Sequence, residues 1–329
     1  MRLPKFDYVE PRSIKEASSI LSDDPKAKIL AGGTDLLVNM KHRVEVPSVI
    51  VNIKRIPELD FIEEKNGSTR IGALTSLKSV YGNPLMEGKL PALTLAASSV
   101  GSYHHQIMGT IGGNICQQNR CKFFNQSKWW RSSRQPCLKA GGEICYVVNK
   151  KGTCYSSYSG DMAPALLVMN AKVRLESNTG VREVSLEDLF SGDGKTPLHL
   201  EGAEILTHVI IPKEAATGFS MYLKFAHRES IDFPIVGIAL WASMERKEVR
   251  VSFTAVDRRP IRGRGVENFL TGKELNEEIL DEAVGLASKE GTPVKTSLYS
   301  PSYKRKLMGL LLKNALKEAM RRVRGSSTA

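Results

Sequence analysis

The sequence lacks a long apolar segment. Its longest apolar run, residues 235–244, falls well short of the roughly 20 residues that span a bilayer and suits a buried strand or helix. The first residues, Met1 to Asp7, contain no apolar core of a signal peptide. We therefore expect a soluble, cytoplasmic protein without a membrane span.

Two common nucleotide-binding signatures are also absent. The chain has no Gly-x-Gly-x-x-Gly motif after a strand and no phosphate-loop motif. A Rossmann domain and a P-loop NTPase are therefore not expected, and any bound dinucleotide must be held by another arrangement.

Cysteine is confined to one segment, which contains Cys116, Cys121, Cys137, Cys145 and Cys154. Because intracellular thiols stay reduced, such a cluster indicates metal or redox chemistry more often than disulfides. Four thiolates suit either zinc or an iron–sulfur cluster. The last four cysteines lack the short paired knuckles of structural zinc sites, which favours iron–sulfur. Cys116 is expected to be a buried free cysteine.

Acidic residues are scarce in the same segment. Between Arg120 and Cys154 there are eight bases and one acid, Glu143, so eight minus one gives a formal charge of +7. The net charge of the 329-residue chain, +12, is compatible with simple solubility or with attraction to nucleic acid, membrane surfaces or an acidic protein. The segment's aromatic residues could shield a metal centre or form a small core of their own: Phe123, Phe124, Trp129, Trp130, Tyr146 and Tyr155.

Helix and strand patterns alternate and predict an α/β fold of three regions, 1–57, 58–214 and 215–329, with an irregular segment at about 117–159. Thr75 is expected to cap a helix. A basic amphipathic helix is expected over 302–324, with Leu310 on its apolar stripe and Lys304 among bases mostly off it. The other expected helices cover 14–21, 36–42 and 91–99, and the expected strands cover 28–30, 48–53, 69–74, 172–175, 235–244 and 249–256.

Two glycine-rich turns occur in the first two regions. Ala31-Gly32-Gly33-Thr34-Asp35-Leu36 lies between an expected strand and an expected helix, and Gly109-Thr110-Ile111-Gly112-Gly113-Asn114 is the second turn. Glycine lets a backbone approach a ligand closely, and N–H groups at a helix start can receive phosphate. One Gly-Gly turn is weak evidence, but two turns suit a pyrophosphate held from both sides.

These turns, with the runs at 52–59, 159–166 and 303–305, resemble the FAD-binding medium subunits of the molybdenum hydroxylases over almost the whole chain. The resemblance implies an α/β (α+β) fold, with a PCMH/VAO-like two-lobed FAD domain and a C-terminal α/β domain of CO dehydrogenase flavoprotein type. It implies that Asp161 contacts ribose or ribityl hydroxyls of FAD and that Lys224 lies near the flavin ring. It implies a molybdenum-cofactor large subunit and a [2Fe–2S] small subunit as partners, in a heterohexamer built as a dimer of heterotrimers. The other implied FAD contacts are Ile29, Leu30, Ala31, Gly32, Gly33, Thr34, Asp35 and Leu36 in the first turn, and Thr110, Ile111, Gly112, Gly113 and Asn114 in the second.

The segment at about 117–159 is an insertion that resembles the beta subunits of 4-hydroxybenzoyl-CoA reductases. This resemblance implies a [4Fe–4S] cluster on Cys121, Cys137, Cys145 and Cys154, an acidic low-potential donor such as ferredoxin, and electron flow inward to FAD and the partner subunits. It implies no catalytic residue in this chain and no nucleic-acid partner. Two alternatives stay open: the FAD subunit of a xanthine or CO dehydrogenase-type hydroxylase that passes electrons outward, and a zinc-stabilised basic nucleic-acid-binding protein.

Overall fold

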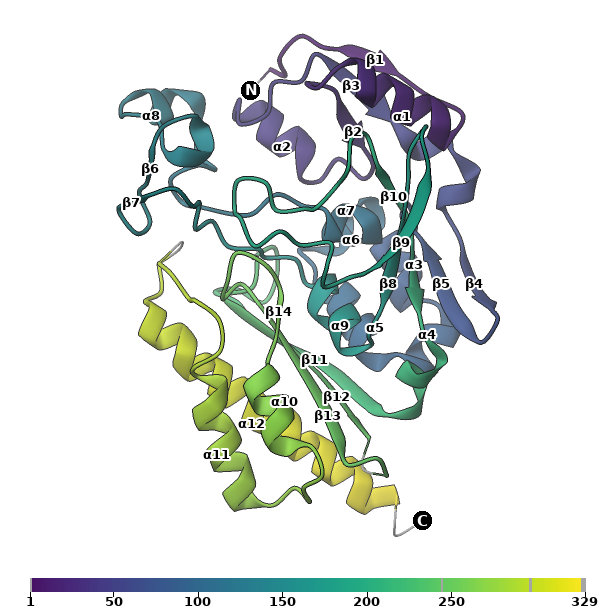
Figure 1. Cartoon of the computed structure of the whole chain (residues 1–329), viewed down its shortest axis with the longest axis vertical. Coiled ribbons are helices and arrows are strands. Elements are labelled where there is room, and N and C mark those ends of the chain that lie inside the picture. Colours follow the sequence, from purple (N-terminus) through teal and green to yellow (C-terminus); the bar gives the residue numbers. More distant parts are fainter. Residues whose placement is uncertain (1, 244, 296–297, 327–329) are drawn as a thin grey trace.

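The computed structural model describes residues 2–243, 245–295 and 298–326. Its N-terminal lobe contains a parallel sheet in the order β1-β3-β2 (Figure 1). Ser13 caps the first helix by accepting a hydrogen bond from the Glu16 backbone N–H (3.2 Å), which confirms the helix start predicted from the sequence. The elements are β1 (Asp7–Val9), α1 (Ile14–Asp23), β2 (Lys28–Leu30), α2 (Leu36–Lys41) and β3 (Val49–Asn52), followed by the 3-10 helices η1 (Ile53–Arg55) and η2 (Pro57–Leu59).

The second lobe is built on an antiparallel sheet in the order β4-β5-β10-β8-β9. The expected cap at Thr75 is wrong, because the Ser76 side chain caps α3 by accepting from the Ser79 N–H (3.0 Å). Thr75 is buried and donates to the Phe61 carbonyl instead (3.0 Å). The strands are β4 (Ile62–Lys65), β5 (Ser68–Gly72), β8 (Lys172–Glu176), β9 (Val181–Ser185) and β10 (Ile205–Ile211), and the helices are α3 (Leu77–Tyr81), α4 (Pro84–Lys89), α5 (Pro91–Ser98), α6 (Tyr103–Met108), α7 (Ile111–Ile115) and α9 (Met162–Val168).

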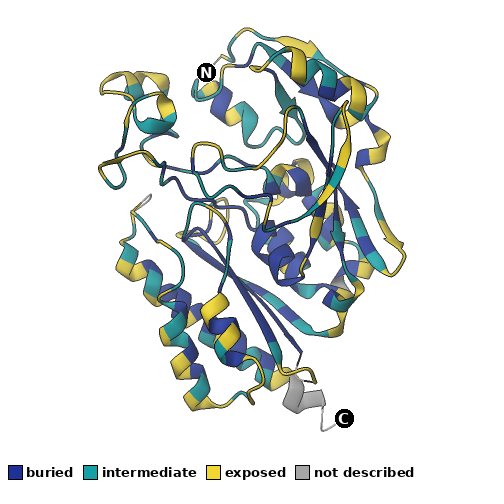
Figure 2. Ribbon diagram, in the orientation of Figure 1, coloured by how far each residue is buried: buried dark blue, intermediate teal, exposed yellow. Residues whose placement is uncertain are grey.

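The C-terminal region folds into an antiparallel sheet, β11-β12-β13-β14, with helices on both faces. Every residue of β12 is buried, because α5 and α9 pack on one side of the sheet and α12 on the other (Figure 2). This explains why the strand was visible in the sequence as a continuous apolar run. The elements are η4 (Lys213–Thr217), β11 (Phe219–Phe225), β12 (Val236–Ser243), β13 (Glu248–Thr254), β14 (Ile261–Arg262), α10 (Arg264–Leu270), α11 (Glu277–Ala287) and α12 (Pro301–Ser326).

The long basic helix α12 differs from its prediction at two positions. Lys304 is only 2% exposed and donates to the Ala255 carbonyl (2.8 Å), whereas Leu310 is 53% exposed. Lys313 and Lys317 pair with acids of α11, so part of the basic face is an interhelix contact rather than a solvated surface. In the described part of the chain no helix combines the length and apolar character needed to cross a membrane.

The cysteine-rich segment forms a projecting loop, residues 121–156, which we call the cysteine loop (Figure 1). Its base is closed by a two-way backbone pair between Arg120 and Ser157 (2.8 and 3.0 Å). Only short elements lie within it: α8 (Lys128–Ser132), η3 (Leu138–Ala140), β6 (Ile144–Cys145) and β7 (Lys150–Lys151).

Candidate functional site

The first glycine turn joins the carboxyl end of β2 to the start of α2. Gly33 has a φ of +74°, a left-handed conformation that favours glycine. Gly32 packs against the backbone just before the second turn. A Cβ at Gly32 would overlap the Met108 carbonyl oxygen and lie 2.8 Å from the carbonyl carbon. The two turns are therefore brought together, as the sequence predicts, and this contact requires Gly32 rather than Gly33.

The first turn presents unused hydrogen-bond donors. Within the described residues, no hydrogen bond engages the backbone N–H groups of Gly32, Gly33, Thr34 or Asp35. Consecutive free N–H groups before a helix form a concave donor set that fits an anion such as a diphosphate. Ile29 and Leu30 belong to β2, while Ala31 and Leu36 flank the turn.

The second turn is built differently from the expectation, because it contains the short helix α7. Thr110 caps that helix, accepting from the Gly113 N–H (3.1 Å). The N–H groups of Ile111 and Gly112 donate to backbone carbonyls (both 3.0 Å), so these donors are already used. Gly112 is buried, and a Cβ added there would lie only 2.7 Å from the Ala73 Cβ, too close for an ordinary contact. Gly113 is exposed. The second turn thus offers an open backbone face at Gly113 rather than free donors.

Asp161 and Lys224 form a buried ion pair, with Lys224 Nζ 3.3 Å from Asp161 Oδ1. The Tyr222 hydroxyl donates to the same carboxylate (2.7 Å), and Lys224 also donates to the Ser99 carbonyl (2.9 Å). Burial raises the pKa of Asp161, while Lys224 and Tyr222 oppose that rise. Any contact of this carboxylate with FAD hydroxyls would add to bonds that it already makes, and it stays a prediction.

The second turn is also tied to this pair through Asn114. Its side-chain oxygen accepts from the Met162 backbone N–H (3.0 Å) at the start of α9, next to Asp161. Asn114 therefore has a structural contact, and its predicted contact with FAD stays untested.

Sequence reasoning missed Arg120. Its guanidinium pairs with Asp35 of the first turn and lies 4.5 Å from the centre of the Phe233 ring. Arg120 directly precedes Cys121, so one ion pair links the base of the cysteine loop to the first glycine turn. Its partner lies 85 residues away in sequence, and no local pattern signals such a pair.

Four cysteines of the loop line one cavity: Cys121, Cys137, Cys145 and Cys154. The cavity is small, because the centre of a water molecule can occupy only about 10 Å³ of it. Phe123, Phe124 and Tyr146 line the same cavity, whereas Trp129 is 82% exposed and shields nothing. The structure therefore brings the four predicted ligands to one cavity, and their role as metal ligands stays a prediction.

The thiols have donors directed at them. The N–H groups of Phe123 and Tyr155 donate to the sulfurs of Cys121 and Cys145 (both 3.5 Å). Burial raises the pKa of Cys121 to about 11, and its neighbouring thiols add to the rise, while backbone N–H groups lower it. Metal binding here would therefore release protons, and the N–H donors would stabilise the bound thiolates.

Lys139 is the cation that lines this cavity, and its ammonium donates to the Asn119 carbonyl (3.0 Å). Burial lowers its pKa, and nearby Cys154 and Cys121 raise it. Cys116 lies outside the cavity and is partly rather than fully buried. Burial of its thiol nevertheless raises the pKa to about 12, which suits an inert thiol.

Comparison with known proteins gives a consistent result. Residues 4–214 match the FAD binding domain in molybdopterin dehydrogenase, and residues 221–319 match the CO dehydrogenase flavoprotein C-terminal domain. The chain is 30% identical over 291 residues to the nicotinate dehydrogenase FAD-subunit of Eubacterium barkeri, covering 84% of this chain and 83% of that one. It is 28% identical over 325 residues to the carbon monoxide dehydrogenase medium chain of Hydrogenophaga pseudoflava, covering 97% and 98%.

A solved structure of carbon monoxide dehydrogenase from Hydrogenophaga pseudoflava superposes with a TM-score of 0.81 at 26% identity, over 98% of this chain and 99% of that one. The mixed α/β fold agrees with that similarity along its whole length. The two family matches, the fold and the paired glycine turns point to one conclusion. The chain is an FAD-binding oxidoreductase subunit that belongs to the medium subunits of the molybdenum hydroxylase family.

Proposed function

We propose that this chain carries both FAD and a [4Fe–4S] cluster and transfers electrons within a molybdenum-containing complex that resembles 4-hydroxybenzoyl-CoA reductase. The reaction would be reductive removal of a phenolic hydroxyl from an aromatic CoA thioester, carried out in a partner subunit. One observation carries the proposal: four cysteines line a single cavity, at the end of a loop whose base is paired to the first glycine turn.

The donor set favours a cluster over zinc. The last four cysteines lack the short paired spacing of structural zinc sites. Four thiols around a common cavity suit a core of several metal atoms, each bound by one thiolate. Aromatic rings and N–H donors to sulfur, both present here, are features that shield and tune such a core.

Bound FAD and the cluster would supply the electron chemistry, and the chain's residues hold and orient them. The free N–H groups of residues 32–35 would receive the diphosphate, with the open backbone at Gly113 opposite. Asp161 would hold the Lys224 ammonium in position beside the flavin. The partners we propose are a molybdenum-cofactor large subunit, a [2Fe–2S] small subunit and an acidic low-potential donor such as ferredoxin, with two such trimers in the complex.

Metal and flavin analysis of the anaerobically purified complex tests the cofactor assignment. We expect about four irons in this chain and one FAD, and little zinc. Cys137→Ser should remove the cluster's visible absorption and keep FAD. Cys116→Ser is the matched control, because that thiol lies outside the cavity and iron should be retained. Wild-type iron content in Cys137→Ser would contradict the ligand assignment.

A second assay separates the proposed reaction from the related hydroxylases. Reduced viologen with 4-hydroxybenzoyl-CoA should give turnover, whereas NAD with a purine should not. The opposite result would favour a xanthine dehydrogenase-type subunit that passes electrons outward. A colourless, zinc-containing protein with salt-dependent nucleic-acid binding would instead favour the zinc-stabilised alternative.

A further inference from the structure

We propose that the outer surface of the cysteine loop around α8 is the docking site for an acidic electron-donor protein. We call it the α8 surface and define it by Lys128, Trp129, Trp130 and Arg134. The inference rests on the proposed function, because it assumes a redox centre in the cavity below.

The exposure of Trp129 is the first observation. At 82%, it is the most exposed large apolar side chain among the described residues. An indole in water leaves much apolar surface uncovered, and Trp is enriched where protein partners bind most tightly. The α8 surface therefore offers an apolar anchor that the rest of this chain does not cover.

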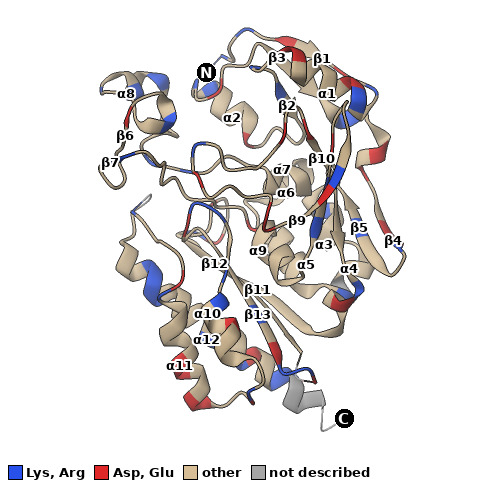
Figure 3. Ribbon diagram, viewed as in Figure 1, with Lys and Arg blue, Asp and Glu red and all other residues tan. Residues whose placement is uncertain are grey.

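The charge of the α8 surface is the second observation. Within the described residues neither Lys128 nor Arg134 has an acidic partner, and Figure 3 shows basic residues on α8. The Arg134 guanidinium lies 3.7 Å from the centre of the Trp130 ring, which keeps its charge at the surface. The surface thus combines an aromatic anchor with uncompensated positive charge, and it complements an acidic protein.

Four of the six other bases counted between Arg120 and Cys154 are engaged, whereas Lys122 and Lys150 are exposed and have no acidic partner among the described residues. Arg120 and Lys151 pair with acids. Arg131 donates to the backbone carbonyls of Gln126 and Arg43, and Lys139 donates to Asn119. Unpaired positive charge therefore lies on Lys122 and Lys150 as well as on the α8 surface, and only the α8 surface combines it with the exposed Trp129.

The α8 surface lies close to the cysteine cavity. Arg131 of α8 donates to the Phe124 carbonyl (3.4 Å), and its guanidinium lies 5.9 Å from the centre of the Phe124 ring. Phe124 itself lines the cavity. Arg131 therefore connects α8 directly to a side chain that lines the cavity.

A protein partner fits better than nucleic acid. Single-stranded nucleic acid is held by stacked bases along a basic groove that follows several phosphates. The stretch 128–134 offers only two cations that are not engaged by folded-state contacts, Lys128 and Arg134. Two neighbouring cations complement a compact acidic patch on a donor protein, next to the donor's own redox centre.

The test uses the assembled complex and stopped-flow mixing with a reduced, acidic [4Fe–4S] ferredoxin, with bleaching of the complex's visible absorption as readout. For Lys128→Glu/Arg134→Glu we expect a second-order rate about tenfold lower at low salt and a weaker salt dependence, because charge steers the encounter. Trp129→Ala should slow the reaction several-fold at all salt concentrations. Reduction by methyl viologen, iron content and FAD content should stay unchanged.

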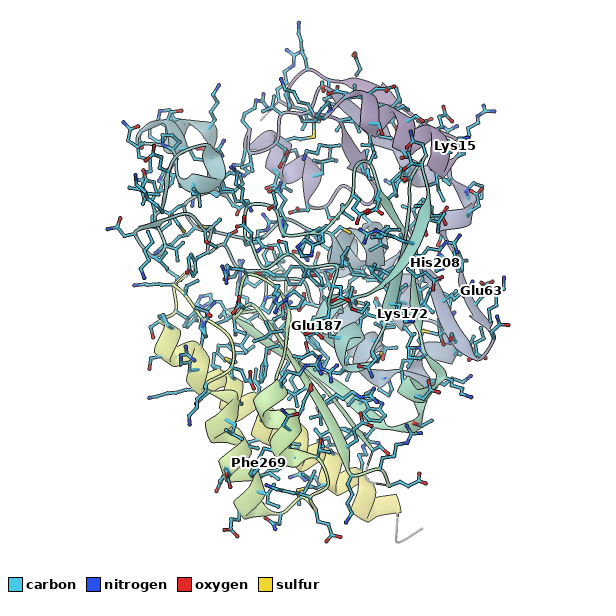
Figure 4. All side chains as sticks on the ribbon, in the orientation of Figure 1. Lys15, Glu63, Lys172, Glu187, His208 and Phe269 are labelled. Atoms are coloured by element: carbon cyan, nitrogen blue, oxygen red, sulfur yellow. The ribbon has the colours of Figure 1, made fainter. Side chains whose placement is uncertain are left out.

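Lys15→Glu/Lys172→Glu is the matched control, since it changes the charge equally at exposed positions away from the loop (Figure 4). Unchanged ferredoxin kinetics in an iron-replete Lys128→Glu/Arg134→Glu complex would overturn the docking site. Protection of Trp129 from oxidative footprinting in the complex without donor would overturn it too, because a subunit would then cover this surface. Oligonucleotide binding abolished by the same variant, with normal ferredoxin kinetics, would assign the surface to nucleic acid. Absence of iron from the unmodified chain would refute the proposed function itself. The bleaching readout can be used without knowing the substrate of the complex.

Discussion

Gly32→Ala should disrupt FAD binding more than Gly33→Ala. A Cβ at position 32 would overlap the Met108 carbonyl oxygen, and neither backbone can yield as a side chain would. The carbonyl must retreat by more than about 1 Å to reach an ordinary contact distance. That displacement separates the two turns that we expect to hold the diphosphate from both sides.

The magnitude follows from this displacement. Losing one hydrogen bond to the charged diphosphate costs about 1.5–3 kcal/mol of binding free energy, which corresponds to roughly 10- to 150-fold in affinity. Gly33→Ala differs because a Cβ there meets only the flexible ends of Leu37 (3.0 Å) and Leu30 (3.2 Å). Alanine at position 33 must adopt the left-handed backbone conformation, which lowers folding stability by about 1–2 kcal/mol. The FAD-free and FAD-bound proteins both bear this cost, so it does not change the affinity. We therefore expect FAD affinity to fall less than about tenfold in Gly33→Ala.

FAD titration of the apoprotein, followed by quenching of flavin fluorescence, measures both affinities. Gly285→Ala is the control, since no atom lies within 4 Å of a Cβ at that position in α11. It should bind FAD normally and gain up to about 1 kcal/mol of stability from helix propensity. Wild-type affinity in Gly32→Ala would refute the idea that close approach of the turns is needed for binding.

Three further substitutions test the ion pairs and the buried lysine. Burial lowers the pKa of Lys304 to about 8, so the unfolded chain binds the proton more tightly than the folded chain. The free energy of unfolding should therefore rise as pH rises above 8. In denaturant, the unmodified chain should gain roughly 1 kcal/mol of stability from pH 7 to 9 relative to Lys304→Met. Lys224→Met leaves the Asp161 carboxylate buried without its cation, and should cost about 3 kcal/mol at pH 7, less at pH 5 where the carboxyl protonates more easily. Arg120→Gln leaves Asp35 unpaired beside the first turn, where it would repel a diphosphate, so FAD titration should show several-fold weaker binding that added salt partly restores.

Features that depend on near neighbours in sequence could be predicted. The Ser13 and Glu16 pair marked the start of α1, because a cap acts within one helical turn. The apolar run of β12 marked a strand buried on both faces. The sequence also grouped Cys121, Cys137, Cys145 and Cys154, which line one cavity in the structure, and their role as ligands stays a prediction.

Features decided by tertiary contacts could not be predicted. Thr75 and Ser76 both offer a capping hydroxyl, and the Phe61 carbonyl decides between them by engaging Thr75. Two adjacent glycines disfavour a helix, yet α7 forms because Thr110 caps it and Gly112 packs on Ala73.

Two ion pairs determine how the predicted site residues are related in space. Asp161 and Lys224 lie 63 residues apart, and Asp35 and Arg120 lie 85 apart, so no periodic pattern connects either pair. Burial makes the first pair sensitive to loss of either partner, because a lone charge would stay without solvent. The second pair has a different consequence. Since Arg120 is held by backbone bonds at the base of the cysteine loop, a change in that base acts on the first glycine turn directly. The loop and the first glycine turn are therefore better described as one connected framework than as independent parts.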